Sequence, residues 1–263
     1  MKKNYRQIAF AVTALITMSS VFADAKGTQI MQSVIDRKKP KFSQSMVVMT
    51  LKDKSGFSET RQVIQYGKDG GNKDYVVMDF KGPASVKDTR FLQITNEGSA
   101  DDKWIYLPSL KNVRRINSSE GSKSFMGTDA TYDDMSDREI DEDEHQYLKD
   151  ETVTVSNGTK YDCHVVKEIP IDKKSSQYNY RITWIDKKTM YPVYTEMYDK
   201  NDKVLKVLEV LKIQNQDGYD IPMETLLKNT QTGHSTSIQV FKIAVDKPIP
   251  DRVFTQEFLK TGK

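Results

Sequence analysis

From Phe42 onwards, apolar and polar residues alternate in short runs that are rich in Val, Ile, Thr, Tyr and Phe. Clusters of Gly, Asn, Asp and Pro separate these runs about every ten residues, which is typical of antiparallel strands joined by turns. The predicted strands are 43–53, 58–67, 74–80, 89–95, 103–107, 112–117, 147–156, 160–169, 177–186, 190–199, 203–214, 219–229 and 235–245. No helical pattern alternates with these strands, so the sequence excludes a doubly wound sheet.

A short amphipathic helix is expected before the first strand. Over residues 28–35 apolar side chains recur at helical spacing, and Pro40 follows the end of the pattern. Among the turns, Asn157-Gly158 carries the strongest signal, because both central residues of a type I′ turn need positive φ.

Two strands are apolar on both faces, at residues 46–49 and 75–78. A sheet with one face in water would not tolerate this pattern, so we expect both faces to be covered. A helix or a second sheet could cover one face, and the other could line a cavity for an apolar ligand. A filled β core is the alternative interpretation, and composition does not decide between the two.

The irregular segment 118–150 separates the two groups of strands. It contains Phe125, Met126, Tyr132 and Met135, which are costly to expose, and it ends near the acidic run 141–144. Loops of this length are usually functional or disordered. We expect the segment to pack over the rest of the protein as a lid or plug; the alternative is a crossover whose apolar residues only patch the core.

The N-terminus has the three parts of a secretory signal peptide. A basic start precedes the apolar run 8–16, and small residues at Val21 and Ala23 flank a cleavage site before Asp24. The apolar run is too short to span a bilayer. We therefore predict a signal peptide over residues 1–23 and a soluble periplasmic protein over 24–263. Cys163 is the single cysteine and lies far downstream, so no cysteine stands directly after the cleavage site to carry a lipid.

Charge and cysteine content narrow the possible partners. Removal of residues 1–23 takes away three positive charges, which lowers the formal net charge from +3 to zero. A nucleic-acid partner is therefore not expected. A single cysteine forms no internal disulfide, so an apolar core must supply the stability.

No catalytic motif is visible, and we expect neither an enzyme nor a bound cofactor or metal. His145, His164 and His234 are far apart in sequence, and Cys163 and His164 would point to opposite faces of a strand. The acidic run 141–144 lacks the glycine and the distal glutamate of an EF-hand loop, so it is interpreted as a solvated face. Arg114 and Arg115 are likewise interpreted as solvated, with contact to a lipid headgroup or acidic partner as the alternative.

Several sequence blocks resemble the LolA-like family of outer-membrane lipoprotein-sorting proteins. The blocks are Trp104-Ile105-Tyr106-Leu107-Pro108, Val113-Arg114-Arg115-Ile116, Ser124-Phe125-Met126-Gly127-Thr128-Asp129, Tyr132-Asp133-Asp134, Trp184-Ile185-Asp186-Lys187 and Tyr191-Pro192-Val193. The resemblance covers essentially the whole mature chain. It implies an incomplete antiparallel β-barrel, with a lid of helices and loops over an apolar cavity.

The resemblance also implies a function. The protein would be a periplasmic carrier or chaperone for a lipid or lipoprotein, acting as a monomer with an inner-membrane transporter of the resistance-nodulation-division (RND) type. The alternative is a regulatory module of the RseB type that senses lipoproteins. Neither Arg61 nor Arg90 lies in a matching motif, so the resemblance assigns neither of them the lid-latching role of the namesake's arginine.

The expected ligand-binding residues are Trp104, Tyr106, Phe125, Met126, Tyr132 and Met135. Trp104 and Tyr106 share one face of their strand, whereas Ile105 and Leu107 share the other. We expect the aromatic pair to face the cavity, because aromatic rings can line an acyl site while their polar atoms reach its wet mouth.

The first prediction concerns processing. The signal sequence predicts that the periplasmic form begins at Asp24. Intact-mass measurement of the periplasmic fraction checks this, and recovery of the full-length chain in the inner membrane would contradict it.

Overall fold

The computed structural model describes residues 25–263, so the predicted signal peptide and its cleavage site before Asp24 lie outside the described residues. Residues 25–35 are helical and lead into the first strand. The strands are β1 (Phe42–Lys52), β2 (Ser58–Asp69), β3 (Lys73–Gly82), β4 (Arg90–Asn96), β5 (Ser99–Leu107), β6 (Asn112–Arg115), β7 (Asp143–Thr154), β8 (Lys160–Pro170), β9 (Tyr180–Asp186), β10 (Pro192–Tyr198), β11 (Val204–Gln216), β12 (Tyr219–Asn229) and β13 (Ser235–Val245). The short helices are η1 (Ser118–Glu120), η2 (Ile140–Glu142), η3 (Asp251–Phe254) and α2 (Gln256–Thr261).

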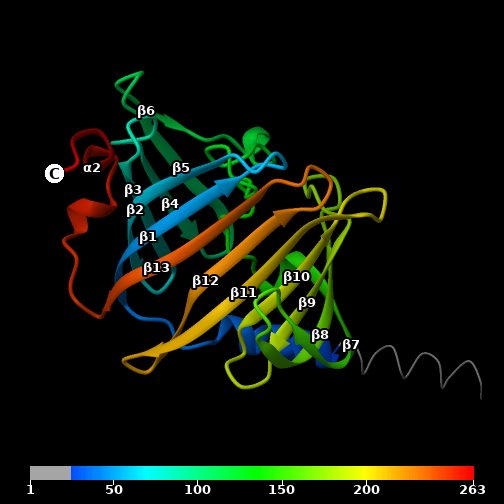
Figure 1. Ribbon diagram of the computed structural model, residues 1–263. Helices are drawn as coiled ribbons and strands as arrows, with labels where there is room; N and C mark the ends of the chain where they lie inside the picture. Colours follow the sequence, from blue (N-terminus) through cyan, green and yellow to red (C-terminus); the bar gives the residue numbers. More distant parts are fainter. Residues whose placement is uncertain (1–24) are drawn as a thin grey trace, which may run out of the picture.

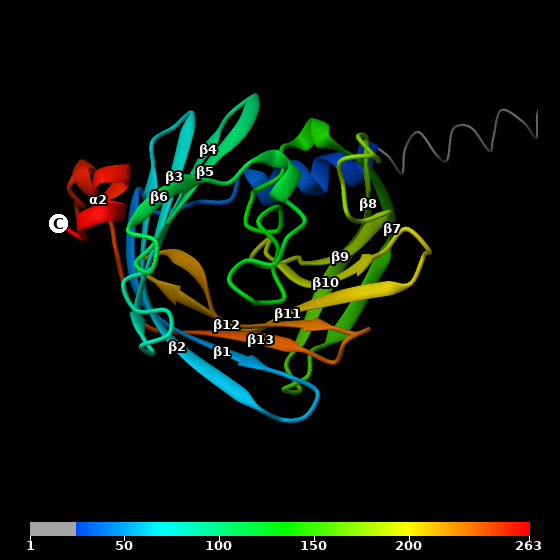
Figure 2. The same cartoon turned by 90° about the horizontal axis from the view of Figure 1, so that it is seen from above.

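All of these strands belong to one 13-stranded antiparallel sheet with the order β6-β5-β4-β3-β2-β1-β13-β12-β11-β10-β9-β8-β7. The first and last strands pair at its centre, and β6 and β7 form its two edges. The sheet curls into a half-barrel that does not close (Figures 1 and 2). This confirms the predicted fold class.

The connection between the two edge strands crosses the inside of the curl. We call residues 116–142 the plug, because Figure 2 shows this green segment lying within the half-barrel. Strand β7 begins at Asp143, so the last part of the segment predicted as irregular is strand instead. The chain has to cross here because the strand order places β6 and β7 at opposite edges.

Two apolar cores lie on opposite faces of the first half of the sheet. The plug core, on the concave face, consists of Val47, Val63, Met78, Phe80, Val86, Phe91, Ile105, Ile116, Phe125 and Tyr132. The C-terminal core, on the convex face, consists of Val77, Leu92, Ile249, Val253, Phe254, Phe258 and Leu259. Neighbours such as Phe91 and Leu92 therefore enter different cores, which explains the strands that are apolar on both faces.

Coverage of both faces holds for β3 but not for β1. Val47 and Met49 are buried, with 5% and 3% of their surface exposed, whereas Met46 is 55% exposed. The C-terminal elements contact β3, β4, β5 and β6, which leaves Met46 uncovered on the convex side. The expectation of two covered faces was wrong for residues 46–49.

The sequence pattern missed the C-terminal helix α2. The Thr255 hydroxyl caps its start by accepting a hydrogen bond from the Phe258 N–H, and Gly262 ends it with φ of 71°. Leu259 is fully buried, and its carbonyl accepts a 3.0 Å bond from Arg90 Nη1. Arg90 Nε also lies 3.2 Å from Asp79, so this arginine fixes the C-terminus to the convex face.

The turn at Asn157-Gly158 differs from the predicted type I′ turn. Gly158 has φ of 88°, but Asn157 does not have positive φ. The Gly158 N–H donates to the Val155 carbonyl, and the Val155 N–H donates to Thr159. This arrangement is a longer hairpin loop in which one residue, rather than two, needs the left-handed conformation.

The N-terminal helix covers the β7 edge at close range. Ile30 packs with Val166 and Ile185, while Gly27 lies directly against the main chain of β7. A Cβ atom at Gly27 would approach within 2.8 Å of the Tyr147 nitrogen and 2.9 Å of the His145 carbonyl. Within residues 25–263, no helix is long and apolar enough to cross a membrane.

We predict that Gly27→Ala destabilises the protein by about 1–3 kcal/mol, because the added methyl group has no space against β7. This sign is opposite to the gain of about 0.5–1 kcal/mol that alanine gives over glycine in an unhindered helix. Urea unfolding measures the difference, and Gln29→Ala on the exposed side of the same helix is the control. A Gly27→Ala protein as stable as wild type would contradict the packing.

Candidate functional site

Phe125 fixes the plug to the first half of the sheet. Its side chain is only 1% exposed, and its ring centre lies 4.9 Å from that of Phe91 and 5.7 Å from that of Tyr132. Met126 and Met135 pack against the same core. The structure therefore brings together four of the six predicted site residues. Burial of a single such side chain stabilises by about 1.5–3 kcal/mol.

A tight turn presents Phe125 to the core. The Phe125 N–H donates to the Ala130 carbonyl, and the chain between them takes positive φ at Met126 (52°) and Gly127 (79°). Arg61 of β2 is buried and donates from Nη1 to the Met126 carbonyl over 2.6 Å. This guanidinium thus holds the tip of the plug by its main chain, whatever side chain stands at position 126.

On the side that faces the second half of the sheet, β7 to β13, the plug makes contacts through charged side chains. Asp134 lies 2.7 Å from Lys206 Nζ, and both side chains are nearly buried, with 11% and 5% exposed. The Tyr178 hydroxyl donates to the same carboxylate over 2.8 Å. Burial and the neighbouring Asp134 raise the pKa of Tyr178 well above its usual range, so it remains a hydrogen-bond donor.

A second polar contact joins the plug to β13. The Asp129 carboxylate accepts a 2.7 Å bond from the Thr236 hydroxyl and lies 2.8 Å from His234 Nδ1. The Asp129 N–H donates to the Thr236 oxygen in turn. Asp129 and Thr236 are buried, so this reciprocal pair satisfies polar groups that would otherwise be costly to enclose.

The end of the plug is bound by an ionic cluster at the start of β7. Arg138 donates to both carboxylate oxygens of Asp143, and Arg181 of β9 lies 3.3 Å from the same carboxylate. Asp143 is only 4% exposed. The interpretation of residues 141–144 as a solvated acidic face was wrong for this residue, because two arginines neutralise it.

The first half of the sheet also makes polar contacts with the plug. Lys103 Nζ donates to the Tyr132 carbonyl over 2.8 Å and to the Ser136 hydroxyl over 2.6 Å. Burial lowers the pKa of Lys103 and raises the pKa of Asp101 beside it. Lys103 and Asp101 are therefore partly desolvated beneath the plug, and their contact with each other offsets part of the desolvation cost.

A hollow of about 790 Å³ lies between the plug, β5 and the segment before β9. Its lining is mixed and rich in charge, and includes Asp101, Lys103, Asp134, Tyr178 and Arg181. We expected Phe125 to Met135 to cover an apolar cavity. That expectation was wrong for the concave side of β2 to β5, because the plug's own apolar side chains fill it.

Trp104 and Tyr106 do not face the plug. Both pack against the C-terminal core, whereas Ile105 and Leu107 belong to or pack against the plug core. The expected orientation of this strand was therefore wrong. Its physical cause is the C-terminal helix, which gives the convex face an apolar partner for the large aromatic rings.

The remaining singled-out residues have structural partners. Cys163 is fully buried, and burial raises the pKa of its thiol to about 12. His164 Nδ1 lies 2.7 Å from Asp150, and His145 is buried with a lowered pKa. Among residues 25–263, no group of three or more potential metal ligands comes together.

Arg114 and Arg115 are exposed but paired. Arg114 contacts Glu120, and Arg115 contacts Asp102. The hydrogen bond from Arg114 is the main reason why the pKa of Glu120 falls to about 2. Arg114 thus links the end of β6 to the start of the plug, and Arg115 links it to β5.

The sequence analysis did not assign Arg61 or Lys206 to the site. Lys206 stands in the apolar run Val204–Val210, and an inward-facing lysine there requires a buried partner. That pattern signals a polar contact but does not identify Asp134, which is distant in sequence.

Comparison with known proteins supports this description of the fold. A family model described as "Uncharacterized protein" matches residues 72–261. A crystal structure of a domain from Vibrio parahaemolyticus, described as an outer membrane lipoprotein-sorting protein domain, is 32% identical with a TM-score of 0.82, covering 90% of this chain and 99% of that one. A DUF1329 family protein from Desulfovibrio piger is 26% identical with a TM-score of 0.83, over the same shares of both chains.

A LolA superfamily protein from Nitrosomonas europaea shares the fold, with 16% identity, a TM-score of 0.64 and coverage of 88% of this chain and 98% of that one. The comparison with curated proteins found no match. The curled sheet with a crossing plug defines the class of LolA-like half-barrels. The chain belongs to the LolA-like family of outer-membrane lipoprotein-sorting proteins.

The contact between Lys206 and Asp134 gives a prediction about stability. Lys206→Met or Asp134→Asn alone should cost about 3–5 kcal/mol, because each leaves a buried charge without its partner. The double variant should cost less than the sum of the two.

Urea unfolding of the four proteins measures this coupling. The exposed pair Lys149 and Glu151, with 54% and 38% of their side chains exposed, is the matched control and should contribute at most about 1 kcal/mol. Strict additivity of the Lys206 and Asp134 effects would contradict a direct contact.

Proposed function

We propose that the protein is a periplasmic carrier or chaperone for a lipid or lipoprotein, which binds acyl chains on the concave face after the plug is displaced. The observation that carries the proposal is the occupation of this face by a crossing segment, with Phe125 and Tyr132 in the plug core. The similarity to the lipoprotein-sorting protein domain from Vibrio parahaemolyticus also supports a lipid or lipoprotein as the cargo.

An acyl chain can replace the apolar contacts that the plug makes with the concave face. Each buried methylene contributes roughly 0.8 kcal/mol, so several methylenes offset the lost burial of Phe125 or Tyr132. The polar groups of the plug, such as Asp134 and Asp129, can be solvated once they leave the sheet. Exchange of plug for ligand therefore leaves no apolar surface of the sheet exposed at either end point.

An inner-membrane transporter of the RND type is the proposed partner. The support is the sequence resemblance to a branch that accompanies such transporters. Cross-linking in cells, followed by purification of the transporter, tests the association.

A regulatory module is the second candidate. The filled concave side favours it, because a sensing protein needs no permanent cavity and can use the plug as a switch. Acyl binding separates the two proposals.

A fluorescent fatty acid should bind the exported protein and be displaced by phospholipid or lipoprotein. Met126→Asp should strengthen the apparent binding by up to about tenfold, because a charge beside the plug core weakens the packing of the plug that the acyl chain has to displace. Aspartate tolerates the positive φ at this position, so the change tests the side chain rather than the backbone.

Leu110→Asp is the control, because Leu110 is 65% exposed and its substitution brings no charge to the plug core. Circular dichroism confirms that each variant is folded. A folded wild-type protein that binds no acyl probe would contradict the carrier and favour the regulatory module.

A further inference from the structure

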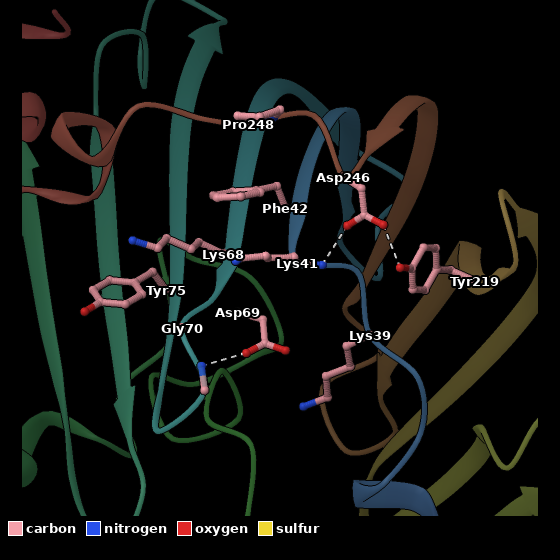
Figure 3. Close-up of a pocket in the computed structure, with 11 residues that line it drawn as sticks. Lys39, Lys41, Phe42, Lys68, Asp69, Gly70, Tyr75, Tyr219, Asp246 and Pro248 are labelled. Atoms are coloured by element: carbon pink, nitrogen blue, oxygen red, sulfur yellow. Dashed lines mark hydrogen bonds between the residues drawn. The ribbon is translucent and has the colours of Figure 1, made fainter.

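A second hollow lies at the rim of the half-barrel, away from the plug core. It is open to solvent, has a volume of about 940 Å³ and is bounded by the connection into β1, the β2–β3 turn and the residues after β13 (Figure 3). Lys39, Lys41 and Lys68 line it, together with the rings of Phe42 and Tyr75. The cations come from two segments that are distant in sequence, so the fold itself creates this concentration of charge.

The three ammonium groups are only weakly neutralised. Within residues 25–263, Lys41 Nζ has no hydrogen-bond or ion-pair partner. Lys39 Nζ lies 3.8 Å from Asp74 and 3.6 Å from Asp137, which is too far for a hydrogen bond. Lys68 Nζ is 2.7 Å from Asp251, but that carboxylate is 84% exposed, and exposed pairs contribute little.

The two carboxylates in the lining already have partners of their own. Asp246 accepts a 2.8 Å bond from the Lys41 main-chain N–H and a 2.6 Å bond from the Tyr219 hydroxyl. Asp69 accepts a 2.8 Å bond from the Gly71 N–H. Neither carboxylate forms an ion pair with a lysine of the pocket. An incoming anion therefore meets an unpaired Lys41 and has to compete with Asp74, Asp137 and Asp251 for Lys39 and Lys68.

Further positive charge surrounds this opening. Lys38 Nζ lies 4.5 Å from the ring centre of Tyr219 at the pocket wall, whereas the neighbouring Arg37 turns away to the ring of Tyr191. Lys38 therefore adds to the positive charge that raises the local concentration of anions. The aromatic walls add apolar surface directly beside the charge.

We propose that this pocket binds a phosphate ester, in the form of the headgroup of an anionic phospholipid. The three lysines contact the phosphate oxygens, and Phe42, Tyr75 and Pro248 contact the glycerol and the first methylenes. The inference rests on the proposed function, because it names the polar part of the cargo. Phe42 and Tyr75 pack against the C-terminal core on the convex face, and Lys39 Nζ lies 3.6 Å from Asp137 of the plug, so the pocket lies at the rim between the two faces of the sheet.

Calorimetric titration of the exported protein with dihexanoyl phosphatidylglycerol, below its micelle concentration, tests the site. Inorganic phosphate and dihexanoyl phosphatidylcholine are the comparison ligands. We expect phosphatidylglycerol to bind about tenfold or more tightly than either, because inorganic phosphate lacks the apolar part and choline brings a positive charge near the lysines.

The triple variant K39Q/K41Q/K68Q should lower this affinity by about tenfold or more. The control K160Q/K173Q/K174Q removes the same charge from exposed positions at the start of β8 and in the turn that follows this strand, and it should bind like wild type. Unchanged binding by K39Q/K41Q/K68Q overturns the site. Equal affinity for inorganic phosphate overturns the assignment to a lipid.

Binding of the fluorescent fatty acid to the same proteins separates this inference from the proposed function. A wild-type protein that binds the fatty acid but not phosphatidylglycerol overturns the pocket and leaves the carrier intact. Lysine-dependent binding of phosphatidylglycerol without fatty-acid binding supports the pocket and contradicts the carrier.

Discussion

The structure depends on the burial of the plug's apolar side chains against the concave face. A curled sheet that does not close leaves one apolar face without a partner, and an exposed face of this kind favours aggregation. Phe125 and Tyr132 cover that face from within the same chain. The strand order makes this possible, because the segment joining β6 to β7 has to cross between the edges of the sheet.

The polar contacts of the plug act differently from its apolar core. Buried pairs such as Lys206 with Asp134 cost desolvation energy that their attraction only partly offsets, so they add specificity more than stability. They fix where the plug lies against β11 and β13, since a shifted register would leave each charge without its partner. In the proposed carrier, they also give the displaced plug a surface that water can solvate, which a wholly apolar plug would lack.

The sequence was sufficient to predict where the strands lie, but not which face of each strand is turned towards the plug. Alternation located β1 to β13 within a few residues, because each strand carries its own period of two. The same alternation could not orient Trp104, since both faces of β5 are apolar and the deciding partner, α2, lies more than 150 residues further along the chain. Phe125 was recognisable as costly to expose, but whether it covers a cavity or fills it depends on the path of the plug. Arg61 and Lys206 were missed because their partners are set by the curl of the sheet rather than by local spacing.

In the proposed carrier, the plug occupies the face that binds the acyl chain, so it determines how tightly that chain binds. If displacement of the plug costs about 3 kcal/mol, the open state is populated at roughly 1%, and the apparent affinity falls about a hundredfold below that of the open protein. An acyl chain supplies roughly 0.8 kcal/mol per buried methylene, so a long chain overcomes this cost whereas a short one does not. The same competition returns the plug to the sheet when a partner withdraws the chain. A carrier built in this way selects for chain length and releases its cargo without exposing its apolar face to water.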